Sequence, residues 1–267
     1  MTAIEFKKTL TWKFIEYIKN QNSDFLITLG NVAKDFINVS KYVLKFEINK
    51  KILIEQCSRY AIDSLPITLT IVSMTAIILA MQIAPELVKQ GGGDYMGMAS
   101  GLVMVREMGA IMAGFAIISM IGSSFASELA SMSVTEQISA MKVLRVDPIK
   151  YLVVPRFLAG VIMMPFVVTI SSFVGLIFAC VISKTTAGIS YLNFFNSLWH
   201  GLYVKDIMVT LLKSSVFGGT ISLISCTCGY STRGGAKEVG ISTTKAVVWS
   251  FLGIAIWDFI FASIFYM

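Results

Sequence analysis

Long apolar runs separated by short charged segments dominate this chain of 267 residues. Four runs of 19 to 27 residues contain no Asp, Glu, Lys or Arg, namely residues 64–85, 108–127, 157–183 and 214–232. A fifth run, residues 246–267, is interrupted only by Asp258. About 20 apolar residues in a helix cross the hydrocarbon core of a bilayer. The pattern therefore predicts an all-α integral membrane protein with about five transmembrane helices.

The composition supports this class. Hydrophobic residues make up 55% of the chain and charged residues only 14%, whereas soluble domains are about 25% charged. The chain is therefore too apolar for a soluble domain.

The 22 Lys and Arg residues predict how the chain is oriented. Ten lie in residues 1–60, four in residues 142–156 and three in residues 233–245. The intervening loops on the other side hold only Lys89, Lys184 and Lys205. Because basic loops stay in the cytoplasm, we expect a cytoplasmic N-terminus and, after five spans, a C-terminus outside. The net charge of +6 then serves orientation, and we expect no nucleic-acid partner.

Residues 1–60 predict amphipathic helices on the membrane surface rather than a cleavable signal peptide, since the first 20 residues lack an apolar core. Apolar side chains recur there at helical spacing. The first stripe is Phe6, Leu10, Phe14 and Ile18, and the second is Phe25, Leu29, Val32, Phe36 and Val43. A small cytoplasmic helical hairpin is the alternative.

Several kinds of chemistry are not supported. Cys180, Cys226 and Cys228 fall within apolar runs and Cys57 lies before them, so they resemble small buried hydrophobic residues. His200, beside Trp199 in a loop, is the only histidine. We expect no metal site, no catalytic residue and no enzyme activity in this chain.

The glycine clusters predict turns rather than a nucleotide site. GGGD at residues 91–94 and RGGAKEVG at residues 233–240 contain no GxxxxGK[ST] phosphate loop. Any work driven by ATP would therefore need a partner protein.

A short charged segment, SELASMSVTEQISAMKVLRVDP, separates the second and third apolar runs. Ser133 and Glu136 have the spacing of a capping box, and Asp147 with Pro148 predicts a stop. We expect a cytoplasmic helix of about 13 residues, roughly 20 Å long at 1.5 Å per residue. It could rest on the bilayer interface or dock on a cytoplasmic protein.

Four charged residues lie in or beside apolar runs and are candidates for a site. Arg106 and Glu107 interrupt an otherwise apolar stretch over residues 95–127. Charges at membrane depth usually face a cavity or a partner. Alternatively the span begins near Met108 and the pair reaches out to the interface. Lys213 could likewise anchor at an interface, and Asp258 could bond Trp or Thr side chains in the bundle.

Three motifs closely resemble the MlaE (YrbE) family of ABC transporter permeases. They are SELASMSVTEQISAMKVLRVDPIKYLVVPRFLAG, MVREMGAIMAG and GGAKEVGISTTKAVVWS, and with the five spans they cover most of residues 60–267 in the family's order. The resemblance implies a cytoplasmic or interfacial segment over residues 1–60 and a permease transmembrane domain over residues 61–267.

The resemblance also implies a function. A homodimer in the cell inner membrane would work with a cytoplasmic P-loop ATPase, which holds the ATP and Mg, and with an MCE-domain lipid-binding protein. It would move phospholipids between the inner membrane and the outer envelope, maintaining outer-membrane lipid asymmetry, with the C-terminus in the periplasm. This chain would carry no cofactor of its own.

The resemblance assigns residues to two roles. It places Arg106 and Glu107 in the lipid cavity, where Arg106 could pair with a lipid phosphate while Glu107 holds its guanidinium. Lys213 and Asp258 are further candidates for this cavity because of their charge in or beside apolar runs. The coupling helix would dock on the ATPase through Glu128, Thr135, Glu136, Gln137, Asp147 and Pro148. One departure is Met120, which stands in S-M-I-G-S where many members have Arg in G-R-x-G-S.

Two other classes remain open at this stage. An ion-coupled secondary transporter would use Glu107 or Asp258 as its proton-coupling carboxylate. A membrane scaffold would have no transport role, and removing the charges of Arg106 and Glu107 would then leave lipid asymmetry intact.

Overall fold

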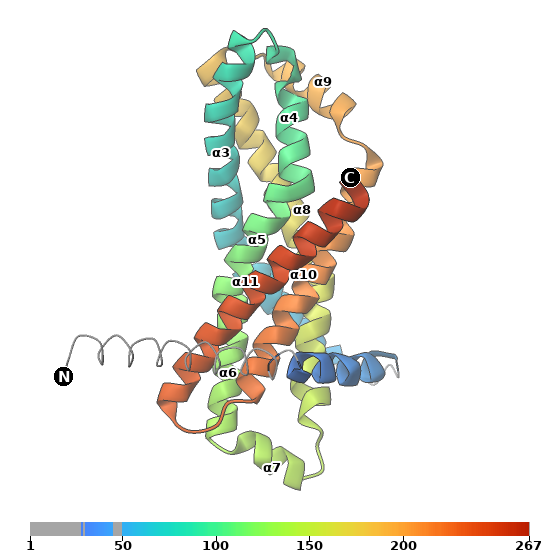
Figure 1. The fold of residues 1–267 in the computed structure, drawn as a ribbon, viewed down its shortest axis with the longest axis vertical. Coiled ribbons are helices and arrows are strands. Elements are labelled where there is room, and N and C mark those ends of the chain that lie inside the picture. Colours follow the sequence, from blue (N-terminus) through green and yellow to red (C-terminus); the bar gives the residue numbers. More distant parts are fainter. Residues whose placement is uncertain (1–27, 29, 45–49, 267) are drawn as a thin grey trace, which may run out of the picture.

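The computed structural model describes residues 28, 30–44 and 50–266, and every regular element in these ranges is helical. Five helical runs there are long and apolar enough to cross a membrane. They are Lys50–Lys89, Gly93–Val134, Ile149–Ala187, Val204–Tyr230 and Ala236–Tyr266. The all-α class and the five spans are thus confirmed (Figure 1). The stripe Phe6, Leu10, Phe14 and Ile18, with Phe25 and Leu29, lies outside the described residues.

The first span is a continuous run. Helix α2 (Lys50–Ser58) passes through a π-helical turn (Arg59–Asp63) into α3 (Leu65–Lys89). The boundary drawn at residues 60 and 61 falls inside this run. A left-handed Gly91 follows, and a 3₁₀ turn (Gly93–Tyr95) leads into the next span, so GGGD forms the predicted turn.

The second span contains two widened turns. Helix α4 (Met96–Val103), α5 (Gly109–Ile117) and α6 (Ser123–Val134) are joined by π-helical turns at Met104–Met108 and Ile118–Gly122. Such single turns are frequent at functional sites. Arg106 and Glu107 lie in the first turn and the half-exposed Met120 lies in the second.

The predicted capping box is wrong. Glu136 takes a left-handed conformation with φ 62°, which separates α6 from the seven-residue α7 (Gln137–Val143). The Ser133 hydroxyl donates to the carbonyl of Thr232 at 2.8 Å instead of capping a helix. The segment is therefore a short α7 after a break, not a helix of 13 residues, because Ser133 is held by the loop after the fourth span.

The last three spans are longer than their uncharged runs. A π-helical turn (Ile149–Val153) precedes α8 (Val154–Ala187), and α10 (Val204–Tyr230) and α11 (Ala236–Tyr266) follow. Helix α10 begins ten residues before residue 214, because its charged residues have partners inside the bundle. Trp199 and His200 lie on an unpredicted helix, α9 (Tyr191–Gly201). Its buried Phe194 packs it against α4.

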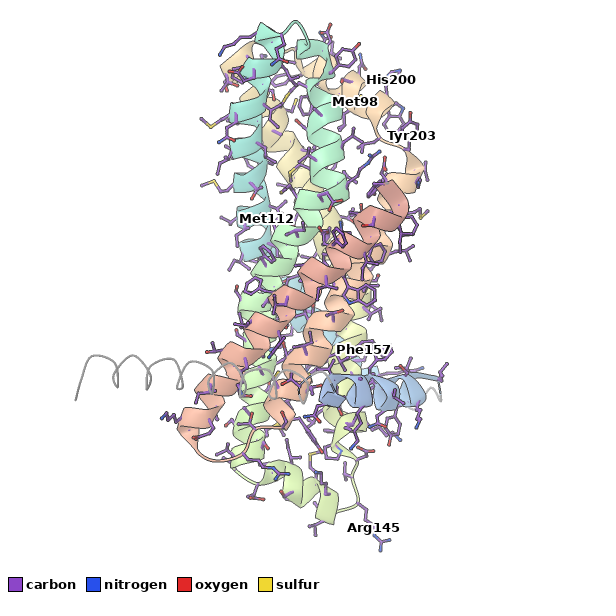
Figure 2. All side chains as sticks on the ribbon, in the orientation of Figure 1. Met98, Met112, Arg145, Phe157, His200 and Tyr203 are labelled. Carbon is purple, nitrogen blue, oxygen red and sulfur yellow. The ribbon has the colours of Figure 1, made fainter. Side chains whose placement is uncertain are left out.

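The bundle is elongated. Helix α7 lies at one end, whereas α9 and the 91–95 turn lie at the other (Figure 1). Figure 2 shows Arg145 at the α7 end and Met98 and His200 at the α9 end. The helix over residues 30–44 lies across the long axis near the α7 end, where Phe36 meets Phe157 of α8 edge to face.

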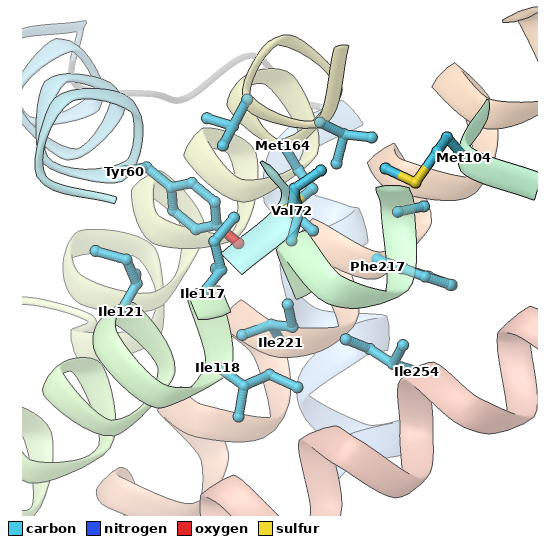
Figure 3. Close-up of a cluster of buried hydrophobic side chains, with 14 of the residues drawn as sticks. Tyr60, Val72, Met104, Ile117, Ile118, Ile121, Met164, Phe217, Ile221 and Ile254 are labelled. Carbon is cyan, nitrogen blue, oxygen red and sulfur yellow. The ribbon is translucent and has the colours of Figure 1, made fainter. Parts of the chain in front are cut away.

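Helix α10 is central to the packing. It contacts α6, α8 and α11, while α3 packs along the opposite part of α8. The buried core includes Tyr60, Ile118, Phe217 and Ile254 (Figure 3). These side chains come from the first, second, fourth and fifth spans, so one core joins them.

Glycines let α8 and α10 touch backbone to backbone. A Cβ on Gly218 would lie 2.1 Å from the carbonyl oxygen of Gly160, and one on Gly160 would lie 2.5 Å from that of Gly218. Small residues allow such close approach between helices in lipid. This crossing positions the α10 face that carries the charged residues described below.

Adding a methyl group at this crossing is expected to destabilise the bundle. Gly218→Ala forces two backbones apart, at a cost of roughly 1–3 kcal/mol. The matched control is Gly240→Ala in α11, where a Cβ meets nothing within 4 Å and helix propensity improves. The melting temperatures of both purified variants in detergent test this. Equal melting of Gly218→Ala and the wild type would contradict the tight crossing.

Candidate functional site

One face of α10 carries three polar residues into the bundle. Asp206, Thr210 and Lys213 stand at positions i, i+4 and i+7, which lie on one side of a helix. All three are buried. They face the first π-helical turn of the second span, and α11 lies beside them.

Arg106 of that turn is held by Asp206. Its Nε lies 2.9 Å from Oδ1 and one Nη lies 3.2 Å from Oδ2, a bidentate pairing that fixes the plane of the guanidinium. The ring of Tyr266, near the end of α11, stacks 4.7 Å from the guanidinium carbon. Asp206 in turn accepts a hydrogen bond from the backbone N–H of Tyr203 at 3.2 Å.

Lys213 joins the second and fifth spans. Its Nζ lies 2.6 Å from Oε2 of Glu107 and also contacts Oδ1 of Asp258. The same ammonium donates to the backbone carbonyl of Arg106 at 3.0 Å. Two hydrogen bonds and a further ion pair to Asp258 therefore surround this one ammonium.

The π-helical turn explains why side chains of α10 can reach the backbone there. A widened turn interrupts the regular carbonyl pairing of an α-helix. The Thr210 hydroxyl lies 2.7 Å from the carbonyl of Val105, and Lys213 reaches the carbonyl of Arg106. Gly109 follows without a side chain, since a Cβ there would lie 2.2 Å from Oγ of Ser172.

The cluster contains two cations and three carboxylates. Lys213 and Asp206 are shielded, with side chains 0% and 3% exposed, whereas the Arg106 and Glu107 side chains are each 30% exposed. Arg106 lies 13 residues after Gly93, or about 20 Å along a helix of 1.5 Å per residue. The site is therefore inside the spans, in their α9-side part, and opens to the surface at Arg106 and Glu107.

The four residues predicted for a cavity are brought together here. Arg106, Glu107, Lys213 and Asp258 come from three spans and meet around α10. The predicted pairing of Glu107 with Arg106 is wrong, because Glu107 pairs with Lys213 and Asp206 holds the guanidinium. Sequence reasoning missed Asp206, although its spacing from Lys213 would have placed both on one helix face.

Four of the residues predicted for coupling are exposed at the α7 end. Thr135, Glu136 and Gln137 form the junction between α6 and α7, and Asp147 follows α7. The apolar side chains of Val143 and Leu144, at the far end of α7, are 82% and 74% exposed. This end can thus offer polar and apolar contacts to a protein partner.

Asp147 and Pro148 also shape the entry into the third span. Oδ1 of Asp147 accepts the N–H of Ile149 at 2.9 Å, and Oδ2 accepts the hydroxyl of Tyr42. Pro148 is buried. Asp147 therefore caps the following turn and connects it to the helix over residues 30–44.

Glu128 lies in the middle of α6, away from α7. Its Oε2 lies 2.9 Å from Arg59 and its Oε1 lies 3.0 Å from Arg156. Both guanidinium groups stack on the ring of Phe125, with their carbons 5.8 and 5.0 Å from its centre. Glu128 thus holds the first and third spans against the second.

Cysteines and histidine form no metal centre in the part of the chain that the structure describes, where no group of three or more His, Cys, Asp or Glu could hold an ion. Cys180, Cys226 and Cys228 are free and buried, as predicted for small hydrophobic residues, and Cys57 is partly buried.

Comparison with known proteins identifies relatives of this chain by sequence. A probable ABC transporter permease of Synechocystis is 38% identical over 218 residues, which cover 82% of this chain and 83% of the relative. One from Rickettsia felis is 34% identical over 215 residues, covering 80% and 83%. The chloroplast protein TRIGALACTOSYLDIACYLGLYCEROL 1 of Arabidopsis thaliana is 35% identical over 224 residues, covering 84% of this chain and 64% of that protein.

The family comparison agrees with the three motifs read from the sequence. The model of Permease MlaE matches residues 53–264, which include nearly the whole of the five spans, the five charged residues of the cluster and α7. Such a permease is a transmembrane subunit, and its designation implies a separate ATPase partner. This chain therefore belongs to the MlaE family of ABC transporter permeases.

Proposed function

We propose that this permease moves phospholipids between the inner membrane and the outer envelope and so maintains outer-membrane lipid asymmetry. A homodimer works with a cytoplasmic P-loop ATPase, which carries ATP and Mg, and with an MCE-domain lipid-binding protein. The substrate class rests on one observation, the partly exposed guanidinium of Arg106 at membrane depth.

The geometry of Arg106 suits a phosphate group. Asp206 engages Nε and one terminal nitrogen, and the other terminal nitrogen makes no hydrogen bond among the described residues. A guanidinium held in one plane can donate that remaining nitrogen to a phosphate oxygen as a charge-assisted hydrogen bond. The Tyr266 ring beside it offers an apolar contact for the rest of a lipid. The name of the Arabidopsis relative refers to a galactosylated diacylglycerol, which supports a glycerolipid substrate but says nothing of a phosphate group.

The uncovered face of α11 supports the homodimer. Within one chain, only 11% of the residues in an apolar 18-residue stretch of α11 are buried, against 33% to 61% in the corresponding stretches of the other four spans. Ile256 and Phe259 are 60% and 69% exposed. A second copy on this face would lie beside Asp258 and Tyr266, so the substrate path would run between two charged clusters.

The basic residues support a cytoplasmic α7 end. Lys142, Arg145 and Arg233 lie in α7 or in the loops at that end, whereas Lys89 and Lys184 lie at the α9 end. The positive-inside rule then orients α7 toward a cytoplasmic ATPase and the C-terminus toward the periplasm. The exposed Val143 and Leu144 suit a docking contact with that ATPase.

An ion-coupled secondary transporter is the alternative, and it would use Glu107 or Asp258 as the coupling carboxylate. Both contact Lys213, so each has a structural partner already. The relatives named as ABC transporter permeases favour transport driven by ATP.

Removing the Arg106 guanidinium is expected to slow lipid movement. Arg106→Gln loses a charge-assisted contact of about 1.5–3 kcal/mol, or about tenfold to a hundredfold in rate. Arg106→Lys should be intermediate, because it keeps the charge but not the planar fork. Phospholipid transfer by the reconstituted complex measures this. The control is Lys89→Gln, which removes one positive charge from an exposed pair with Glu86. Normal transfer by Arg106→Gln at normal protein level would refute the lipid contact.

Lys213 is expected to hold the cluster together. Lys213→Met leaves two carboxylates without their cation, and breaking a buried pair in this way costs about 3–5 kcal/mol. The triple variant Lys213→Met, Glu107→Gln, Asp258→Asn removes all three charges and should regain most of that stability. Melting in detergent and membrane yield compare the two. A single variant as stable as the triple would show that charge balance does not hold these spans.

Reversing the charge at Glu136 is expected to weaken coupling. Glu136→Lys changes the exposed junction before α7 without altering a buried contact, so the chain should fold while ATPase stimulation falls. Glu86→Lys, an equal charge change at the α9 end, is the control. ATP hydrolysis and lipid transfer by the reconstituted complex are the measurements. Unchanged values for Glu136→Lys would remove the docking role from this junction.

A further inference from the structure

A polar groove at the α7 end lies outside the charged cluster. Two adjoining cavities of about 730 and 300 Å³ share Asn31, Thr227 and Arg233 in their walls. The walls come from the helix over residues 30–44, the end of α6, α7, the last turn of α10, the loop after it and the start of α11. Elements far apart in the sequence therefore enclose one groove.

Cations from four of these parts line the groove. Lys34 belongs to the helix over residues 30–44, Lys142 to α7, Arg233 to the loop and Lys245 to α11. Arg233 forms no hydrogen bond or ion pair within the described part of the chain. Lys142 stacks 5.1 Å above the Tyr230 ring. Arg233 is thus a cation of the walls that pairs with no carboxylate of the described residues.

The carboxylates of the groove are partly occupied. Oε2 of Glu238 accepts the backbone N–H of Gly235 at 2.9 Å. Oδ2 of Asp35 accepts the Thr227 hydroxyl at 2.9 Å. Burial raises the pKa of the Asp35 carboxyl, while the Thr227 hydrogen bond and Lys34 act in the opposite direction. The third carboxylate of the walls, Glu136, is exposed. Four cations thus stand against three carboxylates, two of which already accept hydrogen bonds, so the groove favours an anion.

An apolar track leaves the groove along α11. Ile241 lines the groove, and Val248 and Leu252 follow at spacings of seven and four residues, on the same helix face. These three side chains are 47%, 49% and 48% exposed. Cations at one end and a strip of apolar side chains along a span match a phosphate head group with its acyl chains.

We propose that this groove binds an anionic phospholipid of the leaflet at the α7 end, with the head group between Lys34 and Arg233 and an acyl chain along α11. The acyl track lies on the part of α11 before Ile256 and Phe259, where the second copy is proposed to pack, and the site is distinct from the transport path at Arg106. Bound lipid would hold the helix over residues 30–44 against the loop that precedes the fifth span. The site does not depend on lipid being the transported substrate.

Native mass spectrometry of the full chain tests this, with phosphatidylglycerol titrated against phosphatidylcholine. We expect the wild type to bind phosphatidylglycerol preferentially and Lys34→Gln with Arg233→Gln to bind it about tenfold more weakly, or about 1.4 kcal/mol. The matched control, Lys41→Gln with Lys237→Gln, removes two exposed cations from the same region but outside the groove. Equal weakening in both pairs would reduce the effect to general attraction of the leaflet and overturn the site.

Two further arms separate the possible outcomes. Asp35→Asn removes a negative charge and should retain phosphatidylglycerol at least as well as the wild type; loss there would overturn the charge-based recognition. Inorganic phosphate should not displace the lipid, because it cannot occupy the track of Ile241, Val248 and Leu252. Displacement by phosphate at equal concentration would mean a site for free phosphate and would overturn the lipid assignment.

Discussion

The ammonium group of Lys213 is fully buried among the spans, and its charge has to be neutralised where no water reaches it. Glu107 from the second span and Asp258 from the fifth supply this balance, and the carbonyl of Arg106 accepts a hydrogen bond from the same ammonium. A charge with one partner would tolerate several helix arrangements. With partners on two neighbouring spans, the rotation and depth of α10 are more closely restricted.

The rest of the bundle accommodates that position. The π-helical turn at Met104–Met108 brings Arg106 and Glu107 to α10 and leaves carbonyls that Thr210 and Lys213 reach. Gly160 and Gly218 bring α8 and α10 into backbone contact on another part of α10. The position of Arg106 and the packing of the helices are therefore coupled, because the residues that hold Arg106 also fix α10 against its neighbours.

Among the described residues, the α7 end is held together by hydrogen bonds rather than by buried ion pairs. Its contacts are polar and local: Ser133 to Thr232, Asp147 to Ile149 and Tyr42, and Thr227 to Asp35. They connect α6, the helix over residues 30–44, the entry of the third span and the loop before the fifth. An ATPase pressing on α7 would thus act on several spans at once, and a lipid held between Lys34 and Arg233 would lie in the same connection.

The sequence by itself determined the five spans, because hydrophobic length is a local property of consecutive residues, and its motifs identified the family. It also indicated Arg106, Glu107, Lys213 and Asp258, since charge in an apolar run is visible without a fold. Only the tertiary structure decided which of these residues form ion pairs and hydrogen bonds with one another. Asp206 reaches Arg106 across 100 positions of sequence, and Ser133 leaves its predicted cap for Thr232. Such choices depend on distances between helices, which a pattern along one helix does not contain.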